Sequence, residues 1–142
     1  MRLDTGNARA KFAAARVARL ATASADARPH LVPIVFALAD DLLYTAVDAK
    51  PKTTTSLRRL ANIAANPAVA VLVDHYDDDD WTQLWWARAD GTARVVEGDE
   101  AAVAVQLLTA RYPVYKAQPP PGPVLAIDVT HWSGWSAHPL SG

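Results

Sequence analysis

Short runs of apolar and β-branched residues, separated by turn-forming residues, restrict this chain to a small set of folds. The runs cover residues 17–23, 30–38, 42–47, 68–73, 83–97 and 124–135. Most of them follow one another through short connections, and hairpins of that kind join antiparallel neighbours. A small antiparallel sheet removes its exposed edges by curling into a barrel. The pattern therefore predicts a mainly β (α+β) fold built on a small antiparallel barrel of about six strands.

Local signals refine this prediction. Helical spacing predicts three flanking helices, at Asn7–Ala15, from the Thr/Ser cluster before Leu57 to about Asn66, and from Asp99 to about Tyr112. Pro33 lies inside an apolar run and cannot donate a ladder hydrogen bond, which predicts a bulge or an edge strand. Asp90-Gly91 predicts a kink inside the longest run.

Composition excludes several classes of function. A chain of 142 residues is expected to form one domain, residues 1–142, with 51% hydrophobic and 20% charged residues. The net charge of -1 argues against nucleic-acid binding, and the absence of cysteine excludes disulfides and thiolate metal sites. No run approaches the ~18 apolar residues of a membrane helix, and the N-terminus lacks a signal-peptide core. We therefore expect a cytoplasmic protein with no membrane partner.

Residues 48–60 combine a strand end, a basic turn and a helix start. Lys50-Pro51-Lys52 precedes a Thr/Ser cluster that resembles a helix N-cap, and Arg58-Arg59 follows it. Cations are unfavourable at a helix N-terminus, whereas free backbone N–H groups, hydroxyls and basic side chains together bind phosphate. The segment therefore indicates a phosphate site. A solvated basic turn is the alternative that the residues leave open.

The tryptophans give a clue to assembly. Trp85 and Trp86 are adjacent on a predicted strand and must point to opposite faces of the sheet, so only one can enter the core. Trp132 and Trp135 raise the same question on the last strand. Large aromatic residues outside a small core favour an interface or a ligand site. We expect a homodimer with a pocket at the subunit boundary; coverage of the tryptophans by helices is the alternative.

The sequence contains none of the common catalytic motifs. It has no Gly-x-Gly-x-x-Gly after a strand, no Walker A lysine, no Gly-x-Ser-x-Gly and no His-Glu-x-x-His. The four histidines are scattered, and Asp77–Asp80 has the character of a solvated loop, so we expect no metal site. No acid–base pair stands out and catalytic residues stay unassigned. An enzyme of this kind depends on a cofactor for its chemistry.

Segments along nearly the whole chain form one recurring pattern. They are Arg19–Thr22, Arg28–Phe36, Tyr44-Thr45, Lys50–Lys52, Leu57–Ile63, Asn66-Pro67 and Leu72–Tyr76. Together they resemble the pyridoxamine-5′-phosphate-oxidase-like split barrels. The block Leu84–Ala93 is similar to the branch of that superfamily that uses the deazaflavin coenzyme F420 and occurs mainly in actinobacteria. The alanine-rich composition suits such a high-GC source.

This resemblance implies a six-stranded antiparallel split β-barrel of the FMN-binding type, with three flanking helices. It implies a homodimer that binds the cofactor at the subunit interface. The cofactor phosphate would be held by Lys50, Lys52 and Arg59, with Arg58 as an alternate, and the ring would lie against Val32, Pro33 and Ile34. Trp86 is a candidate wall for the ring or the substrate. Arg88 and Arg94 are candidates for the polyglutamate tail of F420.

The function implied is an F420-dependent oxidoreductase that exchanges a hydride with a small unsaturated or quinone-like substrate. Water, His75 or Tyr76 would protonate the substrate. Three alternatives stay open: an FMN-dependent enzyme on the same scaffold, a protein that carries a flavin or deazaflavin without turnover, and a haem-handling barrel suggested only by the scattered histidines.

Overall fold

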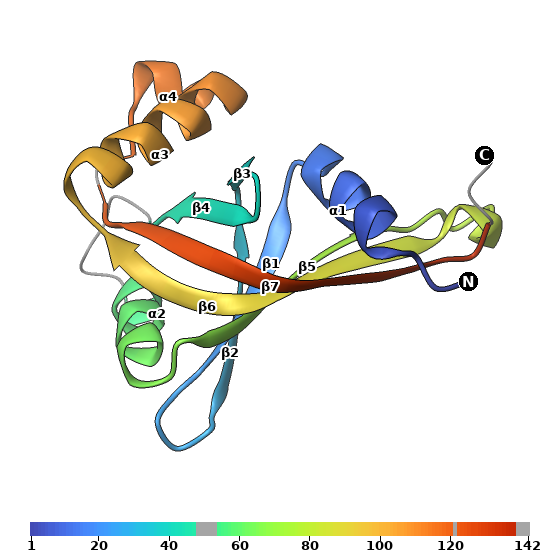
Figure 1. The fold of residues 1–142 in the computed structure, drawn as a ribbon, viewed down its shortest axis with the longest axis horizontal. Coiled ribbons are helices and arrows are strands. Elements are labelled where there is room, and N and C mark those ends of the chain that lie inside the picture. Colours follow the sequence, from blue (N-terminus) through green and yellow to red (C-terminus); the bar gives the residue numbers. More distant parts are fainter. Residues whose placement is uncertain (48–53, 121, 139–142) are drawn as a thin grey trace.

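In the described part of the chain, seven antiparallel strands form one sheet that bends round on itself as an open barrel (Figure 1). A computed structural model describes residues 1–47, 54–120 and 122–138, with the backbone alone at 54–57. The strands are β1 (Ala18–Ala23), β2 (Pro29–Ile34), β3 (Ala37–Ala39), β4 (Leu42–Ala46), β5 (Ala68–His75), β6 (Trp85–Val96) and β7 (Val124–Ser136). Their order in the sheet is β2-β1-β5-β6-β7-β4-β3.

The prediction of six strands is wrong, because the apolar run 30–38 divides into two strands. β2 pairs only with β1, and β3 pairs only with β4, so the two halves of the run lie at opposite edges of the sheet. Val35 and Phe36 form the break between them. The edge position of β2 agrees with the signal from Pro33, since an edge strand tolerates a residue without an N–H group. The barrel therefore stays open between its two edges.

The helices also exceed the three expected. The described part contains α1 (Thr5–Ala14), α2 (Thr54–Ala65), α3 (Gly98–Arg111), the one-turn helix α4 (Val114–Ala117) and the 3-10 helix η1 (Trp81–Gln83). Pro113 precedes α4 with a helical backbone, where its missing N–H group costs no hydrogen bond. Among these helices, none has the length and apolar character needed to cross a membrane.

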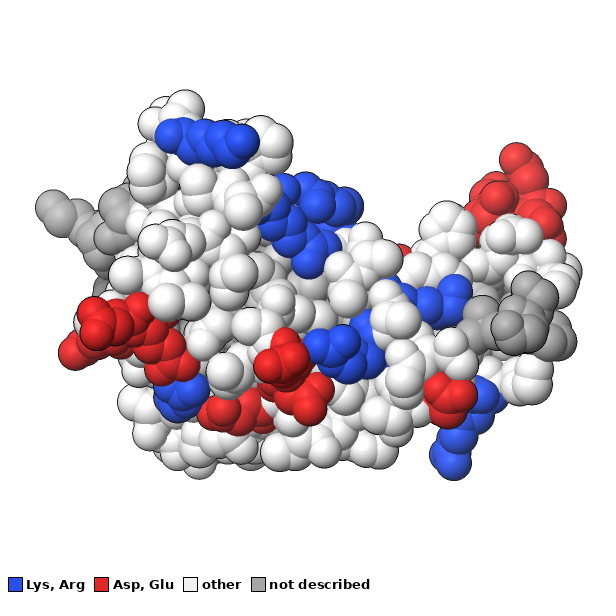
Figure 2. Space-filling view, turned by 45° about the horizontal axis from the view of Figure 1, so that its top comes forward, with Lys and Arg blue, Asp and Glu red and all other residues white. Residues whose placement is uncertain are grey.

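β5, β6 and β7 extend beyond the barrel as a long arm (Figure 1). The register of β6 against β7 shifts between Asp90 and Gly91, which confirms the predicted kink. A Cβ atom at Gly91 would overlap the carbonyl oxygen of Asp128, so the close approach of the two strands requires glycine. The loop Asp77–Asp80 joins β5 to η1 at the end of the arm, as expected, and Figure 2 shows an acidic group there.

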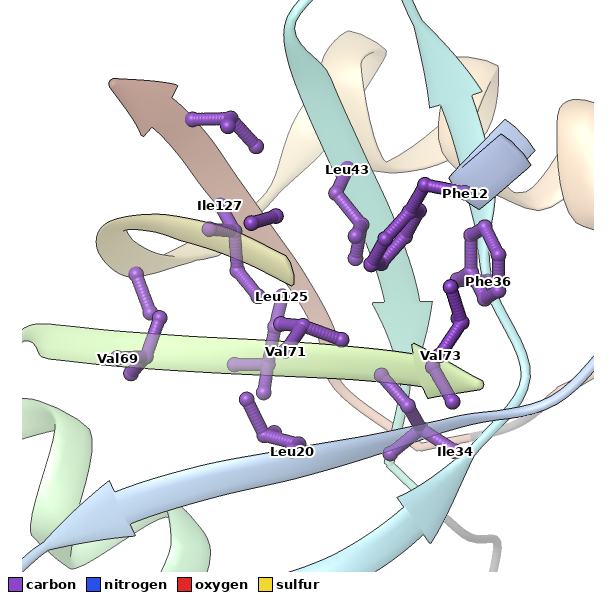
Figure 3. Close-up of a cluster of buried hydrophobic side chains, with 14 of the residues drawn as sticks. Phe12, Leu20, Ile34, Phe36, Leu43, Val69, Val71, Val73, Leu125 and Ile127 are labelled. Carbon is purple, nitrogen blue, oxygen red and sulfur yellow. The ribbon is translucent and has the colours of Figure 1, made fainter. Parts of the chain in front are cut away.

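The core lies between the curled sheet and α1 (Figure 3). Phe12 of α1 is fully buried, with ring centroids 5.0 Å from Phe36 and 5.2 Å from Trp132. Val69, Val71 and Val73 alternate along β5 with their side chains inward, which is the pattern of a strand with one buried face. A second cluster beneath α3 includes Tyr44, Val96 and Ala104. Because Phe36 is part of this core, the core holds in place the point of the chain at which β2 ends and β3 begins.

Candidate functional site

A cleft of about 520 Å³ lies beside the break between β2 and β3. It is lined by Pro33, Ile34, Val35, Ala46, Val47, Arg59, Val114, Tyr115, Gln118, Pro119 and Pro120. Its volume falls in the range of small-molecule sites, which is about 300–1,000 Å³. Among these described lining residues, Arg59 carries a charge and none is acidic. A cleft that combines apolar side chains with polar groups and one buried cation suits a flat ligand that carries an anionic group.

The strand wall of the cleft comes from two of the three β2 residues predicted to meet a ring. Pro33 and Ile34 line the cleft. Val32 is 8% exposed, belongs to the hydrophobic core and is not among the residues that line the cleft. Pro33 sits on the exposed face of an edge strand, where its backbone leaves no N–H group to be paired.

The predicted phosphate site is described only in part. Arg59 is 7% exposed and lines the cleft, whereas Arg58 beside it is exposed. Lys50 and Lys52 lie outside the described residues. The structure therefore places Arg59 with Pro33 and Ile34 in one cleft, although they are separated by more than twenty positions in the sequence.

A buried polar cluster lies between β2, β1 and α2. His30 pairs with Thr22 in the strand register, and the Asn62 amide donates a hydrogen bond to the Thr22 hydroxyl at 3.1 Å. Burial, and then the positive charges of Arg58 and Arg59, lower the pKa of His30 from its ordinary value of 6.5. The two arginines thus create a positive potential at this edge of the sheet, which favours an anion and disfavours a further cation.

The opposite wall of the cleft was not anticipated from the sequence. Val114 and Tyr115 of α4 line it, together with Gln118 and the Pro119-Pro120 pair that follows. By composition alone, the proline-rich stretch 118–123 is typical of an extended loop. Pro113 before a four-residue turn is the one local signal of α4, and such a signal is too short to separate a helical turn from a loop.

Trp86 and Arg88 lie elsewhere, on the outer face of the sheet. They help to form a second hollow of about 660 Å³, the aromatic pocket, which is lined by Leu72, Asp74, His75, Tyr76, Leu84, Trp85, Trp86, Arg88 and Trp135. The Arg88 guanidinium stands 5.7 Å from the Trp86 ring and forms an ion pair with Asp90 at 3.2 Å. Trp85 also borders the aromatic pocket, but it packs against the core from the other face of the sheet, with Lys11 Nζ 4.7 Å from its ring. The predicted division of the two tryptophans is therefore confirmed.

The strand register separates the aromatic pocket from the cleft within one chain. Arg88 pairs with Leu72 on β5, Leu72 with Arg19 on β1, and Arg19 with Pro33 on β2. Adjacent strands are about 4.8 Å apart, so three steps across the sheet correspond to roughly 14 Å. Trp86 and Arg88 therefore cannot contact a small ring that lies against Pro33 of the same chain.

Other candidate groups do not form a catalytic set within the described residues. His75 and Tyr76 line the aromatic pocket and not the cleft. The Arg94 guanidinium binds Glu100 at 2.7 and 3.0 Å and Asp128 at 3.0 Å, so two carboxylates already occupy its donors. No group of three or more His, Asp or Glu side chains with metal-binding geometry occurs among the described residues.

Comparison with known proteins extends over nearly the whole chain. The family model described as pyridoxamine 5′-phosphate oxidase matches residues 5–136. A search among curated proteins gave no match by sequence.

Solved structures share the fold at low identity. A structure described as a FAD-binding protein from Mesorhizobium loti has a TM-score of 0.73 and 22% identity, covering 94% of this chain and 95% of the other. A FAD-binding protein from Mycobacterium smegmatis has a TM-score of 0.66 and 18% identity, and the match covers 95% of this chain and 96% of the other. A heme storage protein from Vibrio cholerae has a TM-score of 0.69 and 16% identity, and the match covers 94% of this chain and 95% of the other. One scaffold thus supports proteins described by different ligands.

Proposed function

Because the chain belongs to the pyridoxamine 5′-phosphate oxidase family, we propose that it is an oxidoreductase that holds coenzyme F420 in the cleft beside β2. The observation that carries this proposal is the meeting of Arg59, Pro33 and Ile34 in one cleft with no acidic residue in its described lining. An anionic group would lie at Arg59, and a flat ring would lie against the β2 wall. The similarity of Leu84–Ala93 to the F420-using branch favours the deazaflavin.

The roles of the residues follow from this placement. Arg59 and Arg58, with Lys50 and Lys52 of the preceding segment, would hold the cofactor phosphate by charge-assisted hydrogen bonds. Pro33 and Ile34 would orient the ring, and α4 would cover it and exclude water. When bound, the cofactor supplies hydride transfer to a small unsaturated or quinone-like substrate. The chain itself contributes binding, orientation and a dry cleft.

We further propose that the active form is a homodimer joined through the outer face of the sheet. Leu31 is 66% exposed there and pairs with Ala21, and Leu72 lies beside Ala70 in a shallow apolar groove. An Arg19–Asp74 ion pair borders this groove. The aromatic pocket lies on the same face, so a second copy seated on it would bring its own Trp86 and Arg88 toward the cleft. Apolar patches of this kind mark interaction sites.

An FMN-dependent enzyme is the second candidate. The relatives described as FAD-binding proteins favour an ordinary flavin, whose phosphate and ring would use the same cleft. A protein that binds the cofactor without turnover fits the absence of histidine and carboxylate from the described cleft lining. Haem iron requires an axial ligand, and Tyr115 is the residue of the described cleft lining whose side chain is of a haem-ligating type.

A fluorescence titration of the purified chain with F420 and with FMN, side by side, tests the proposal. We expect tighter binding of F420, followed by its reoxidation when a panel of quinone-like acceptors is added to the reduced complex. Preference for FMN would transfer the function to the second candidate. Tight binding with no reaction across the panel would indicate a carrier, and binding of neither cofactor would contradict the proposal.

A further inference from the structure

Tyr112, at the end of α3, forms a hydrogen-bonded bridge to the break between β2 and β3. Its hydroxyl accepts a hydrogen bond from the Phe36 N–H at 3.1 Å. The hydroxyl has one proton to donate, and it lies 2.9 Å from the Phe36 carbonyl oxygen and 3.1 Å from the Arg16 carbonyl oxygen, which share that donor. Phe36 is fully buried and belongs to neither strand, so its N–H and C=O have no ladder partner. One side-chain hydroxyl therefore satisfies both.

Two arginines hold the ring of Tyr112 in this position. The guanidinium carbon of Arg16 is 4.7 Å from the ring centroid, and that of Arg111 is 5.6 Å from it. Arg111 also lies 4.7 Å from the Phe36 ring. The Arg16 side chain donates to the Arg111 carbonyl oxygen at 2.8 Å, and Arg111 donates to the Ala15 carbonyl oxygen. We call the set Arg16, Phe36, Arg111 and Tyr112 the clasp.

The clasp lies between the two walls of the cleft. On the strand side, Phe36 directly follows Val35, which lines the cleft and whose carbonyl accepts a hydrogen bond from Thr45 at 2.7 Å. On the helix side, Tyr115 lines the cleft, its N–H donates to the Tyr112 carbonyl at 2.9 Å, and the two tyrosine rings meet edge to face at 6.2 Å. Tyr112 itself does not line the cleft.

The geometry points to Tyr112 as a positioning residue that sets the spacing between the β2 wall and the α4 wall of the cleft. β2 and α4 are joined neither by a ladder nor by a common helix, so the clasp is the described hydrogen-bonded link between them at this end. A flat ligand requires walls held at a defined separation, because dispersion contacts weaken steeply with a gap of even 0.5–1 Å. This inference rests on the proposed function in that the ligand is a ring-bearing cofactor.

The variant Tyr112→Phe keeps the ring and removes only the hydroxyl. Tyr44→Phe is the matched control, because it removes a hydroxyl that bonds Glu100 at 3.0 Å near the opposite end of α3. Hydrogen exchange of the protein without ligand should become at least tenfold faster at the amides of Phe36 and Tyr115 in Tyr112→Phe. The amide of Val71, in the centre of the sheet, should keep its rate. Unchanged exchange at Phe36 and Tyr115, or the same increase in the control, would overturn the inference.

Ligand binding separates positioning from general destabilisation. In Tyr112→Phe the affinity for F420 and FMN should fall by about tenfold, the scale of one lost hydrogen bond to a buried group. Inorganic phosphate should bind to Tyr112→Phe with the same affinity as to the wild type, as measured by the chemical-shift changes that phosphate causes near Arg59. An equal loss of phosphate and cofactor binding would contradict the positioning role. A wild-type chain that binds neither cofactor contradicts the proposed function. In that case the hydrogen-exchange experiment alone tests whether Tyr112 holds the two walls of the cleft together.

Discussion

The cleft and the aromatic pocket are two hollows in the same sheet, and they differ in the charged residues that line them. In the cleft, Arg59 is buried among lining residues of which none described is acidic. In the aromatic pocket, Arg88 is paired with Asp90, and Asp74 lies within 3.7 Å of Arg19. The described lining of the cleft therefore carries one cation and no carboxylate, whereas the aromatic pocket combines broad ring faces with acidic and basic side chains. The first resembles a phosphate site and the second an interface.

The largest expected effect comes from Arg59→Met, which keeps an apolar stem and removes the charge from the cleft. Loss of a charge-assisted hydrogen bond to phosphate, about 1.5–3 kcal/mol, should weaken F420 and FMN binding by roughly ten- to a hundredfold. Arg2→Met, which removes an equal charge from an exposed residue at the other end of the sheet, is the control. Equal affinity of Arg59→Met and the control, measured by fluorescence titration, would remove Arg59 from the site.

The aromatic pocket is tested through assembly. Leu72→Asp places a carboxylate on the apolar outer face and should convert a dimer to a monomer in analytical ultracentrifugation, because a buried unpaired charge is strongly unfavourable. Val103→Asp, at a residue of α3 that is 49% exposed, should keep the dimer. A wild-type chain that sediments as a monomer at micromolar concentration would refute the interface.

The arm that carries the aromatic pocket depends on the bulge at Gly91. Gly91→Ala should lower the free energy of unfolding by about 1–3 kcal/mol, since the added methyl group overlaps the backbone of Asp128. Gly6→Ala is the matched control: its added Cβ would meet Asp4 at an ordinary 3.6 Å inside α1 and should stabilise by about 0.4–1 kcal/mol. Chemical denaturation of both variants measures whether each substitution lowers or raises the free energy of unfolding. Equal changes in the two variants would rule out the close approach of β6 and β7 as the cause of the loss in Gly91→Ala.

The smallest expected effect is the pH dependence of His30. The pKa of His30 in the folded chain lies below 6.5, its ordinary value in the unfolded chain. Between the folded and the unfolded pKa the unfolded chain binds more protons, so the stability of the fold decreases as the pH falls through this window. An anion at Arg58 and Arg59 removes part of the charge that lowers this pKa, and should therefore raise it. NMR titration of the His30 ring with and without inorganic phosphate measures both. A His30 pKa that does not move with phosphate would place the anion elsewhere.

Local signals in the sequence predicted much of the sheet. Pro33 predicted a bulge or an edge strand, and β2 lies at the edge; the kink followed from Asp90-Gly91, and the division of Trp85 and Trp86 from strand alternation. The seventh strand was missed because no turn residue occurs at Val35-Phe36, where the apolar run divides, so this break comes from the curvature of the whole sheet. Local periodicity does not record such a constraint.

The candidate site could be predicted from the sequence less completely than the fold. Its strand wall and its arginine were expected through the resemblance to a family, and the structure places Pro33, Ile34 and Arg59 together. The α4 wall and the clasp depend on contacts between residues about 75 positions apart, such as Phe36 and Tyr112. A single sequence carries no signal of such a pair.

The most direct test of the account is a residue-resolved NMR titration of the wild-type chain with inorganic phosphate. Phosphate is too small to bridge the two hollows, so it reports the anion site alone. We predict saturable shifts at the amides of Arg59 and Asn62 and at the ring of His30, with the indole signals of Trp86 and Trp135 unchanged. Shifts confined to Trp86, Arg88 and Trp135 would contradict the assignment of the cleft as the phosphate-binding site.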